Sequence, residues 1–529
     1  MGQSKSQASG FGKADRPNQT AKPRLRSQPS GQDPKWGIAK EKEALRLLME
    51  NRLEEAEIAY RELISTGHVN PICLGNLAGI YATTNRWEPA AELLRQALQL
   101  KPDYADAHSN LGLALQSLGD LDAAIDSYNT ALSLKPDYPE ALNNLGTALH
   151  KQGDLIPALE ALTSAISLRP NYPSAHYNRG IVLEEQGHVD AAIAAYDTAL
   201  RLRPDYPDAS ANRAMALLLK GDYQRGWPAY DGRFRVARGR TALIARPQCP
   251  AWDGAALPAE QTVLLVSEQG LGDTLMFMRY LPALRQRGIQ ARLCAPIKLH
   301  SLIQASGIDP EPLSPEDAQQ LQEARWMPLL SLPRHLGVSA SQPLIQGPYI
   351  SAPEPLIQHW HTRLGTEQRP IIAINWQGNP EHETTNSRGR SLALECFAPL
   401  AANPKLRLLS LQKGFGSEQL DRCSFRDRFV DAQAEVDATW DFLDNAAIIA
   451  ACDLVITSDT SIAHLAAGLG KTTWLLLKQV PEWRWGLEGE RTGWYPSMRL
   501  FRQRERGNWA EVMERVAAAL EGLTGSASR

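Results

Sequence analysis

Apolar and small residues between positions 37 and 236 recur with helical spacing, in segments of helix length that repeat along the chain. The interval is 34 positions, and it is kept by alanines, by glycines and by the two fixed residues of a Pro-x-Tyr string. These residues are Ala90, Ala124, Ala158 and Ala192, Gly119, Gly153, Gly187 and Gly221, Pro102, Pro136, Pro170 and Pro204, and Tyr104, Tyr138, Tyr172 and Tyr206. Because glycine ends helices and proline marks connections, each interval predicts two helices, and the array predicts a stacked solenoid.

A 34-residue unit of two helices with small residues at fixed places matches the tetratricopeptide repeat. We place repeats at 37–70, 71–104, 105–138, 139–172 and 173–206, with a diverging sixth from residue 207. The first repeat lacks several of the recurring residues, so it is expected to cap the stack, as terminal solenoid repeats do.

The second half of the chain has another pattern, in which short apolar runs of strand length alternate with helix-like segments. Strands are predicted within 263–266, 291–299, 326–330, 371–379, 406–416 and 453–459. A polar, proline-bearing bridge near 352–369 separates two groups of these units. The pattern predicts two doubly wound α/β domains with a cleft between them.

The predicted fold is therefore an α-solenoid followed by two α/β domains. The predicted parts are a disordered leader at 1–36, the solenoid at 37–236, a linker at 237–260, α/β domains at 261–355 and 356–522, and a flexible tail at 523–529. The leader has almost no large apolar residues, so burial cannot offset the entropy of ordering it.

Composition narrows the class of protein. The 529 residues are 43% hydrophobic and 22% charged, which is typical of globular proteins, and the net charge of −3 gives no reason to expect a nucleic-acid partner. The six cysteines form no CxxC pair, which argues against a zinc site or a disulfide framework. No apolar run approaches the roughly 20 residues of a membrane span. We expect a cytoplasmic protein without a bound metal.

The string from Val263 to Asp273 runs from an apolar strand into Gly270, Gly272 and Asp273, where a helix-like pattern begins. Ligands of parallel α/β sheets lie beyond the carboxyl ends of strands, and glycine lets the backbone come close to them. Asp273 has two open interpretations, since it either acts on a ligand or caps the helix. The third glycine of the GxGxxG dinucleotide pattern is absent, so a nicotinamide site is not predicted.

A second string, at 453–471, runs from a predicted strand through Asp459, Thr460 and Ser461 into a helix of small residues. Free N–H groups at the start of this helix and the hydroxyl side chains would converge on one spot. Such a spot is suited to anions and to sugar hydroxyls.

Together these strings resemble the motifs of the heptosyltransferase-like glycosyltransferases of family nine, which have the GT-B fold. The C-terminal motif of that family, Asp-Thr-small-x-x-His, is matched by Asp459, Thr460, Ser461 and His464, and its Gly-Asp motif is matched by Gly272 and Asp273. The resemblance covers about residues 255–505. The strings WRW at 483–485 and WYPSMRLF at 494–501 resemble those of proteins that fuse such a transferase to tetratricopeptide repeats. The resemblance implies a GT-B fold with an acceptor-side domain at 261–355 and a donor-side domain at 356–522.

The resemblance also implies roles for these residues. Asp273 would be the general base that takes a proton from an acceptor hydroxyl as it attacks the anomeric carbon, with inversion, and Gly270 and Gly272 would form the acceptor-side loop. Asp459 would hold sugar hydroxyls of the donor. Thr460 and Ser461 would hold its diphosphate.

Further donor contacts follow from the same resemblance, which implies that cationic side chains and backbone amides, rather than a metal, stabilise the leaving diphosphate. The candidates are Arg388 and Arg390, with Gly378 and Asn379 in the turn before them, and the alternative is a solvated loop. His464 would bond a phosphate or orient Asp459, or it is a packing histidine. Glu418 falls where the family often carries an acidic residue for the nucleotide ribose. No cofactor is implied beyond a nucleotide-diphosphate sugar as co-substrate.

One polar residue recurs inside the repeats, at Asn76, Asn110, Asn144, Asn178 and Asn212. Equal positions of successive repeats form a row, and each amide can donate to and accept from a peptide backbone. The row resembles the asparagine ladder of O-linked N-acetylglucosamine transferase. Two interpretations stay open, namely that the ladder binds a peptide or that each amide fixes the stacking of its own helices.

Two functions of different classes follow. The first is an inverting, metal-independent glycosyltransferase that uses a nucleotide-diphosphate sugar, with repeats that recruit a protein partner or acceptor. The second is a non-catalytic scaffold in which the repeats bind peptides and the transferase-like part only binds a ligand or partner. Family members that act on lipopolysaccharide carry a lysine near Arg388 and Arg390 and have no repeats, so the acceptor can be a protein, a glycan or a lipid.

Overall fold

The computed structural model describes residues 34–236, 243–258, 261–383 and 388–526. Most of the predicted leader, at 1–33, lies outside the described residues, as do 237–242 and 259–260 of the predicted linker and 527–529 of the predicted tail. The chain divides into two compact units, Met1–Ala209 and Ser210–Arg529.

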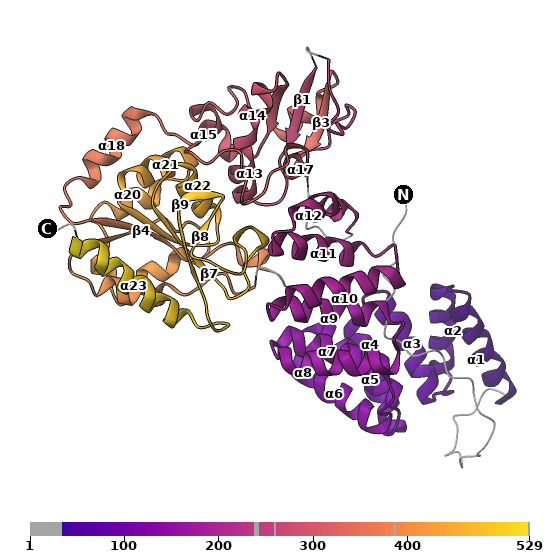
Figure 1. The fold of residues 1–529 in the computed structure, drawn as a ribbon. Helices are drawn as coiled ribbons and strands as arrows, with labels where there is room; N and C mark the ends of the chain where they lie inside the picture. The colour runs from indigo at the N-terminus through magenta and orange to yellow at the C-terminus, as the bar shows by residue number, and fades with distance from the viewer. Residues whose placement is uncertain (1–33, 237–242, 259–260, 384–387, 527–529) are drawn as a thin grey trace. The chain divides into compact units, whose positions relative to one another are not determined.

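The first unit is a stack of helix pairs, seen in Figure 1 as the indigo to magenta ribbons. Its helices are α1 (Pro34–Met49), α2 (Leu53–Ser65), α3 (Pro71–Thr83), α4 (Trp87–Leu100), α5 (Ala105–Leu118), α6 (Leu121–Leu134), α7 (Pro139–Gln152), α8 (Leu155–Leu168), α9 (Pro173–Glu185) and α10 (Val189–Leu202). These helix pairs confirm the predicted α-solenoid.

The small residues of the repeat are needed where paired helices touch. A Cβ atom added to Gly112 would lie 2.7 Å from the ring of Tyr128, and one added to Gly180 would lie 2.5 Å from Tyr196. Helices α5 and α7 are followed by the C-cap residues Gly119 and Gly153, which have φ angles of 90° and 108°. A residue with a side chain would be strained in this left-handed conformation. The period of 34 therefore reflects close packing and turn geometry together.

The second unit begins within α11 (Pro207–Lys220) and continues through α12 (Tyr223–Tyr230) and the 3₁₀ helix η1 (Asp231–Arg235). Residues 210–236, which the repeat pattern assigned to the solenoid, thus belong to the same compact unit as the α/β part.

The first sheet of this unit is parallel, with strand order β2-β1-β3. Its strands are β1 (Thr262–Val266), β2 (Gln290–Cys294) and β3 (Ala324–Pro328), and its helices are α13 (Leu271–Phe277), α14 (Leu281–Gln286), α15 (His300–Ala305), α16 (Pro315–Gln320) and α17 (Leu332–Leu336). In register, Leu264 of the central strand faces Arg292 and Trp326. Buried on both faces, β1 is a continuous apolar run, as expected for a parallel strand.

The second sheet has the order β5-β4-β6-β7-β9-β8, parallel except for the pair β8 and β9. Its strands are β4 (Ile371–Asn375), β5 (Arg407–Ser410), β6 (Leu454–Ser458), β7 (Thr473–Leu477), β8 (Arg491–Thr492) and β9 (Tyr495–Arg502). The accompanying helices are α18 (Glu354–Leu364), α19 (Ala398–Ala401), α20 (Gln433–Ala438), α21 (Phe442–Ala451), α22 (Ser461–Gly468) and α23 (Trp509–Ser526), drawn from orange to yellow in Figure 1.

In both sheets the strand that comes first in the chain is internal. The chain adds one neighbour, β2 or β5, on one side of it and then crosses to the other side to add β3 or β6. Such a point, where the strand order reverses, leaves a crevice outside the carboxyl ends of the strands, where ligands of α/β proteins bind. The residues that leave β1, β4 and β6 are therefore placed for function.

Two predicted connecting segments take part in the fold. Within the predicted linker, Leu243 bridges to Glu268 and Ala251 bridges to Trp326, so this part of the segment packs on the first sheet despite its loop-like composition. Helix α23 continues to Ser526, past residue 522, where the tail was expected to begin. In the described ranges, none of the helices has both the length and the apolar character needed to cross a bilayer.

Candidate functional site

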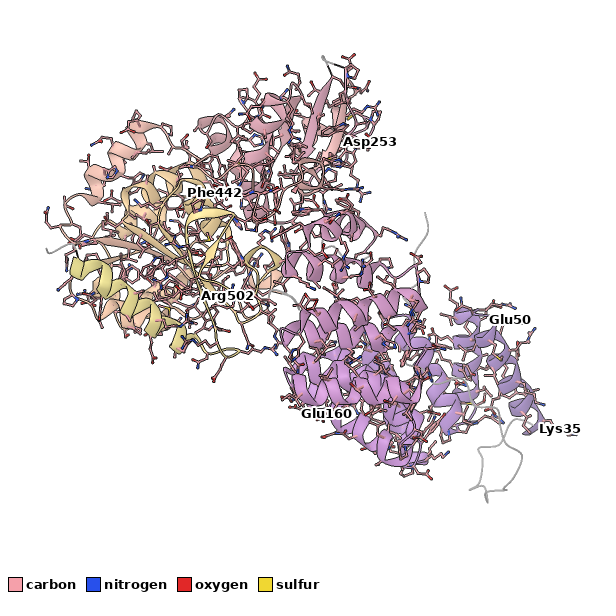
Figure 2. All side chains as sticks on the ribbon, in the orientation of Figure 1. Lys35, Glu50, Glu160, Asp253, Phe442 and Arg502 are labelled. Carbon is pink, nitrogen blue, oxygen red and sulfur yellow. The ribbon has the colours of Figure 1, made fainter. Side chains whose placement is uncertain are left out.

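A cleft of about 970 Å³ opens at the carboxyl ends of strands from both sheets. One wall comes from the loop after β1 and from α13, and the other from the ends of β4, β5 and β6 and the segment after β7. Phe442, labelled in Figure 2, also lines the cleft at the start of α21. The predicted residues that line it are Gly270, Gly272, Asp273, Gly378, Asn379, Arg390, Asp459, Thr460, Ser461 and His464.

Asp273 lies in the first turn of α13. Its Oδ2 accepts a hydrogen bond from the N–H of Gly270 across 3.0 Å, which is a helix-capping contact. Its Oδ1 accepts a hydrogen bond from the guanidinium of Arg484. Asp273 therefore caps its helix and also faces the cleft, so the two interpretations of this residue are compatible.

Arg484 belongs to the 3₁₀ helix η9 (Trp483–Trp485), which follows β7. Its side chain is 6% exposed, and it contacts Asp273 with one nitrogen and Glu482 with another, the latter across 2.5 Å. Burial by itself would lower the pKa of Arg484, but the charges of Asp273 and Glu482 raise it above the ordinary value. Arg484 thus joins carboxylates from the two α/β parts of this unit at the cleft.

Asp459 follows β6 directly and is held by the same η9 segment. The indole N–H of Trp485 donates to its Oδ2 across 2.9 Å. Burial raises the pKa of Asp459, while the hydrogen bond from Trp485 and the charges of Arg390 and Arg484 lower it in part. Among the described residues its Oδ1 has no hydrogen-bond donor, so this oxygen can accept from a ligand.

Side chains beside Asp459 tie three strand ends together. Asn375, at the end of β4, accepts from the hydroxyl of Thr460 across 2.8 Å and donates to Gln412, which follows β5, across 2.8 Å. Gln412 in turn accepts from the backbone N–H groups of Trp376 and Gln377. Because Thr460 immediately precedes α22, this network fixes where that helix begins.

His464 lies on α22, and its imidazole stacks on Trp485 with ring centroids 5.5 Å apart. Its Nδ1 is hydrogen-bonded to the hydroxyl of Tyr495 across 2.9 Å. Burial, followed by the charges of Arg484 and Arg279, holds the pKa of His464 well below its ordinary value. In this structure Trp485, rather than His464, orients Asp459.

Gly272 is the point of closest approach between α13 and α22. A Cβ atom added there would lie 2.9 Å from Cδ2 of His464 and 3.5 Å from Cα of Ser461. The glycine predicted to make room for a ligand thus makes room for the opposite helix, and it brings Asp273 beside the motif that begins at Asp459.

The basic loop after β4 contributes Arg390 to the cleft. A Cβ atom on Gly378 would lie 2.9 Å from a guanidinium nitrogen of Arg390, which also contacts Glu383 across 3.5 Å. Arg388 is exposed and is not among the residues that line the cleft. Residues 384–387, between these segments, lie outside the described residues.

Glu418 lines a second pocket of about 320 Å³. This side pocket shares Gln412, Lys413, Gly414 and Trp440 with the main cleft, so the two are continuous. The indole of Trp440 is 69% exposed there. The carboxylates of Asp421 and Asp437 lie in the same pocket.

The helices that open the second unit support the loop after β1. Arg233 of η1 donates two hydrogen bonds to Glu268, at 2.8 and 2.6 Å, and both side chains are almost fully buried. The amide of Gln269 donates to the hydroxyl of Tyr230 across 2.9 Å, and Gln269 has a φ of 61°, which is unusual for a residue with a side chain. The hydrogen bonds from Arg233 and to Tyr230 therefore fix the backbone that leads into Gly270.

The asparagines of the repeats differ in their contacts. Asn76 donates to the hydroxyl of Tyr60 across 2.9 Å, and Asn178 donates to the side chain of Asn143 across 2.9 Å. Asn110 and Asn144 are 8% and 5% exposed, and in the described part of the chain Oδ1 of the former and Nδ2 of the latter have no hydrogen-bond partner. Asn212 is buried in the second unit.

Several residues of the site were not predicted from the sequence. Asn375, Gln412, Glu482 and Arg484 line the cleft, and Trp485 and Tyr495 are hydrogen-bonded to the cleft residues Asp459 and His464. The string from Glu482 to Trp485, with four aromatic or charged side chains after a buried strand, carried the one usable signal, since polar and aromatic residues after a parallel strand lie at its ligand-binding end.

Comparisons with known proteins found similarity to parts of several chains. Protein FlbA of Caulobacter vibrioides is 28% identical over 184 residues, which are 33% of this chain and 29% of FlbA. The chain thus spans less than a third of the length of this relative. The crystal structure of MamA is 25% identical with a TM-score of 0.28, over 30% of this chain and 94% of MamA. A thermophilic tetratricopeptide protein of Thermus thermophilus is 21% identical with a TM-score of 0.31, over 34% and 99% of the two chains.

Family models match the region of the predicted repeats. A TPR repeat model matches residues 79–119 and 116–153, and a tetratricopeptide repeat model matches 143–207 and 177–233. The N-terminal region of this chain is therefore an array of tetratricopeptide repeats.

Proposed function

We propose that residues 261–522 form an inverting, metal-independent glycosyltransferase of the GT-B fold, which moves a sugar from a nucleotide-diphosphate sugar to an acceptor hydroxyl. The observation that supports this most directly is that strand ends of both sheets open on one cleft, with Asp273 on one wall and Asp459 on the other. Two α/β sheets that share a cleft can hold donor and acceptor on separate walls. The resemblance of the two motifs to family nine points to the same chemistry.

In this reaction Asp273 takes the proton of the acceptor hydroxyl. The acceptor oxygen forms a bond to the anomeric carbon while the bond from that carbon to the diphosphate oxygen breaks, and the electron pair leaves with the diphosphate. Arg484 and the N–H of Gly270 each hold one oxygen of Asp273, so the carboxylate is oriented before the acceptor arrives.

The donor sugar and its diphosphate would lie along the wall formed by the second sheet. Asp459, held by Trp485, accepts hydrogen bonds from sugar hydroxyls. The diphosphate lies at the start of α22, where the hydroxyls of Thr460 and Ser461 and free N–H groups meet. Arg390, in the loop after β4 beside Gly378, supplies positive charge for the leaving group.

The nucleoside of the donor would extend into the side pocket. Its base stacks on the exposed indole of Trp440, and its ribose hydroxyls donate to Glu418. Because the pocket is continuous with the cleft at Gln412 and Lys413, one elongated donor can reach both.

The repeats would recruit a protein partner, and this partner is the acceptor or carries it. Tetratricopeptide solenoids commonly present an extended surface to peptides. Oδ1 of Asn110 and Nδ2 of Asn144 have no partner among the described residues, but both atoms are buried, so a peptide backbone can pair with them only if neighbouring side chains move. If the acceptor is instead a glycan or a lipid, the repeats serve only in assembly with other proteins. We place this activity in the cytoplasm, since all six cysteines are free thiols.

The scaffold alternative has an observation in its favour, because both oxygens of Asp273 are already engaged by Gly270 and Arg484. Binding and turnover separate the two functions. Calorimetry with UDP-glucose, GDP-mannose and ADP-glucose measures donor binding, and an assay of released nucleotide diphosphate measures turnover. We expect one of these donors to show both. Asp273→Asn should keep donor binding and lose turnover by at least about a hundredfold. Asp427→Asn, an exposed aspartate of the same unit, is the matched control.

Each result bears on one function. Donor binding without turnover in the wild type supports the scaffold, and equal turnover in wild type and Asp273→Asn removes Asp273 from the mechanism. For the repeats, the triple change of Asn110, Asn144 and Asn178 to Ala should weaken capture of a cellular protein partner while donor binding is unchanged. Equal loss of both would show that the substitutions only destabilise the chain.

A further inference from the structure

A buried arginine lies behind the cleft without a carboxylate in contact among the described residues. Arg279 is 1% exposed, and it donates to the carbonyls of Met276 and Trp494 and to the hydroxyl of Tyr349, at 2.7, 2.9 and 3.0 Å. Its guanidinium also stacks between the rings of Tyr349 and Tyr495, at 4.4 and 4.3 Å from their centroids. Arg279 thereby fixes two tyrosines that reach toward the cleft.

These tyrosines form a chain of hydrogen bonds that ends on His464. The hydroxyl of Tyr349 donates to the carbonyl of Leu275 across 2.9 Å. The hydroxyls of Tyr349 and Tyr495 are 3.2 Å apart, and the hydroxyl of Tyr495 is 2.9 Å from Nδ1 of His464. Each contact requires one proton between its two heavy atoms.

Because the pKa of His464 lies well below its ordinary value, the ring is neutral, and counting these protons selects one of its two neutral tautomers. The proton of Tyr349 is used on the carbonyl of Leu275, which can only accept, and Arg279 can only donate to Tyr349. The contact between the tyrosines must then use the proton of Tyr495. The contact between Tyr495 and His464 is left to the Nδ1 proton of His464. With a proton on Nδ1 all three contacts are hydrogen bonds. In the other neutral tautomer, which has its proton on Nε2, one of the three contacts has no proton between its two heavy atoms.

The opposite edge of the ring faces the cleft. His464 lines it, and no protein group among the described residues is hydrogen-bonded to its Nε2. A half-turn of the ring would put Cδ2 in place of Nδ1 beside the hydroxyl of Tyr495 and lose that hydrogen bond, so the ring keeps Nδ1 toward Tyr495. A neutral imidazole with a proton on Nδ1 presents a bare lone pair at Nε2.

We propose that His464 accepts a hydrogen bond at Nε2 from a hydroxyl of the bound sugar, with Arg279, Tyr349 and Tyr495 as residues that fix its tautomer. This inference rests on the proposed function for the identity of the ligand. It differs from a phosphate contact, because a lone pair repels a phosphate oxygen and attracts a hydroxyl proton. His464 also lies one helical turn beyond Thr460 on the wall assigned to the donor, which favours a donor hydroxyl over an acceptor hydroxyl.

The tautomer is measurable without any ligand. Nitrogen-15 correlation spectra of the full chain, with the His464 signals assigned by their loss in His464→Gln, should show a protonated Nδ1 and a bare Nε2. Tyr495→Phe removes the oxygen that accepts from Nδ1, so the His464 signals should shift toward a mixture of both tautomers. A protonated Nε2 in the wild type, or spectra of Tyr495→Phe identical to the wild type, would overturn the assignment.

Binding then tests the ligand. Affinities are measured by calorimetry for UDP-glucose, GDP-mannose and ADP-glucose and for UDP, GDP and ADP alone. His464→Leu should weaken the sugar nucleotide that binds by about three- to tenfold and leave its nucleotide diphosphate unchanged, as expected for one lost hydrogen bond to the sugar. His464→Gln, whose amide oxygen can replace Nε2, should recover most of the loss.

The outcomes separate this inference from the proposed function. Equal weakening of the sugar nucleotide and the nucleotide diphosphate by His464→Leu would assign His464 to the phosphate and refute the inference, while the transferase proposal stands. If neither the sugar nucleotides nor the diphosphates bind, the proposed function and the sugar contact fail together, and the spectra still decide the tautomer. Acceptors are absent from these titrations, so unchanged sugar-nucleotide affinity in His464→Leu would exclude the donor hydroxyl.

Discussion

The indole N–H of Trp485 donates to Oδ2 of Asp459 across 2.9 Å, while the indole ring stacks on His464. One tryptophan thereby sets the position of two residues of the motif that follows β6. Its neighbour Arg484 contacts Asp273 on the other wall of the cleft. The η9 segment, which comes after β7, thus connects the residues that the proposed reaction requires.

Removing the indole N–H should disturb Asp459 more than the fold. In Trp485→Phe the aromatic stacking partner of His464 is kept, but the half-buried carboxylate of Asp459 loses a hydrogen-bond donor, which costs about 1 kcal/mol of unfolding free energy. Donor affinity should fall as Asp459 is released, which calorimetry measures. Trp509→Phe is the control, and an equal effect of both substitutions would show that only tryptophan volume matters.

Arg484 balances two carboxylates, so its removal should leave like charges close together. We expect Arg484→Gln to lower the free energy of unfolding by about 2 to 3 kcal/mol. Adding Glu482→Gln should restore part of that loss, because it removes one of the two uncompensated charges. Urea unfolding followed by tryptophan fluorescence reports on the second unit, since all tryptophans except Trp36 and Trp87 belong to it. Strictly additive losses would argue against a shared charge network.

The buried pair of Arg233 and Glu268 holds the loop that leads to Asp273. Arg233→Met should cost about 3 to 5 kcal/mol, because Glu268 is left buried without its counterion. Combining Arg233→Met with Glu268→Gln should cost less than the single change. The exposed pair of Arg225 and Asp222 provides the control, and Arg225→Met should stay within about 1 kcal/mol in the same urea experiment.

The elements that carry a strong periodic or apolar signal were predictable. The strand predicted at 263–266 is β1, which begins one residue earlier, and the one predicted within 453–459 is β6 at Leu454–Ser458. Parallel strands are buried on both faces, so their sequences are continuous apolar runs. Strand β7, at Thr473–Leu477, has the same apolar signal but is not among the predicted strands, because only a short Gly-Lys turn separates it from the apolar, small-residue helix before it.

The hydrogen-bond partners of the predicted site residues could not be predicted from the sequence. Asp273 and Arg484 are 211 positions apart, and no spacing rule relates a loop after β7 to a helix of the first sheet. The contact of Trp485 with Asp459 likewise depends on how η9 folds back over the sheet. Motif strings identified Asp273, Asp459 and His464 as cleft residues, whereas the charges that surround them follow only from tertiary packing.

Gly272 offers a test of the contact between α13 and α22. The Cβ atom of Gly272→Ala would lie 2.9 Å from Cδ2 of His464, whose ring is held by Trp485 and Tyr495 and cannot give way easily. We expect a loss of about 1 to 3 kcal/mol of unfolding free energy and a weakened donor affinity. Gly347 has open space around it and no left-handed backbone, so Gly347→Ala should change stability by no more than about 0.5 kcal/mol. Similar losses for both would mean that α13 and α22 are not in close contact.

His464 should make the second unit less stable at mildly acidic pH. Its pKa in the folded chain lies well below the ordinary value, because of burial and the charges of Arg484 and Arg279. The unfolded chain binds a proton to this histidine below about pH 6.5 and the folded chain does not, so stability falls as the pH drops through that value. From about pH 7.5 to about pH 5.5 this loss is about 1 kcal/mol.

Comparison of variants isolates this contribution from neighbouring groups. The pKa of Asp459 is raised by burial, so its contribution to stability changes with the opposite sign as the pH falls. Urea unfolding of wild type and His464→Gln at both pH values cancels that effect, and the variant should show the smaller acid-induced loss. His361→Gln, at an exposed histidine of α18, should behave like the wild type. Parallel pH dependence in wild type and His464→Gln would mean that His464 takes up a proton in the folded state as readily as in the unfolded one.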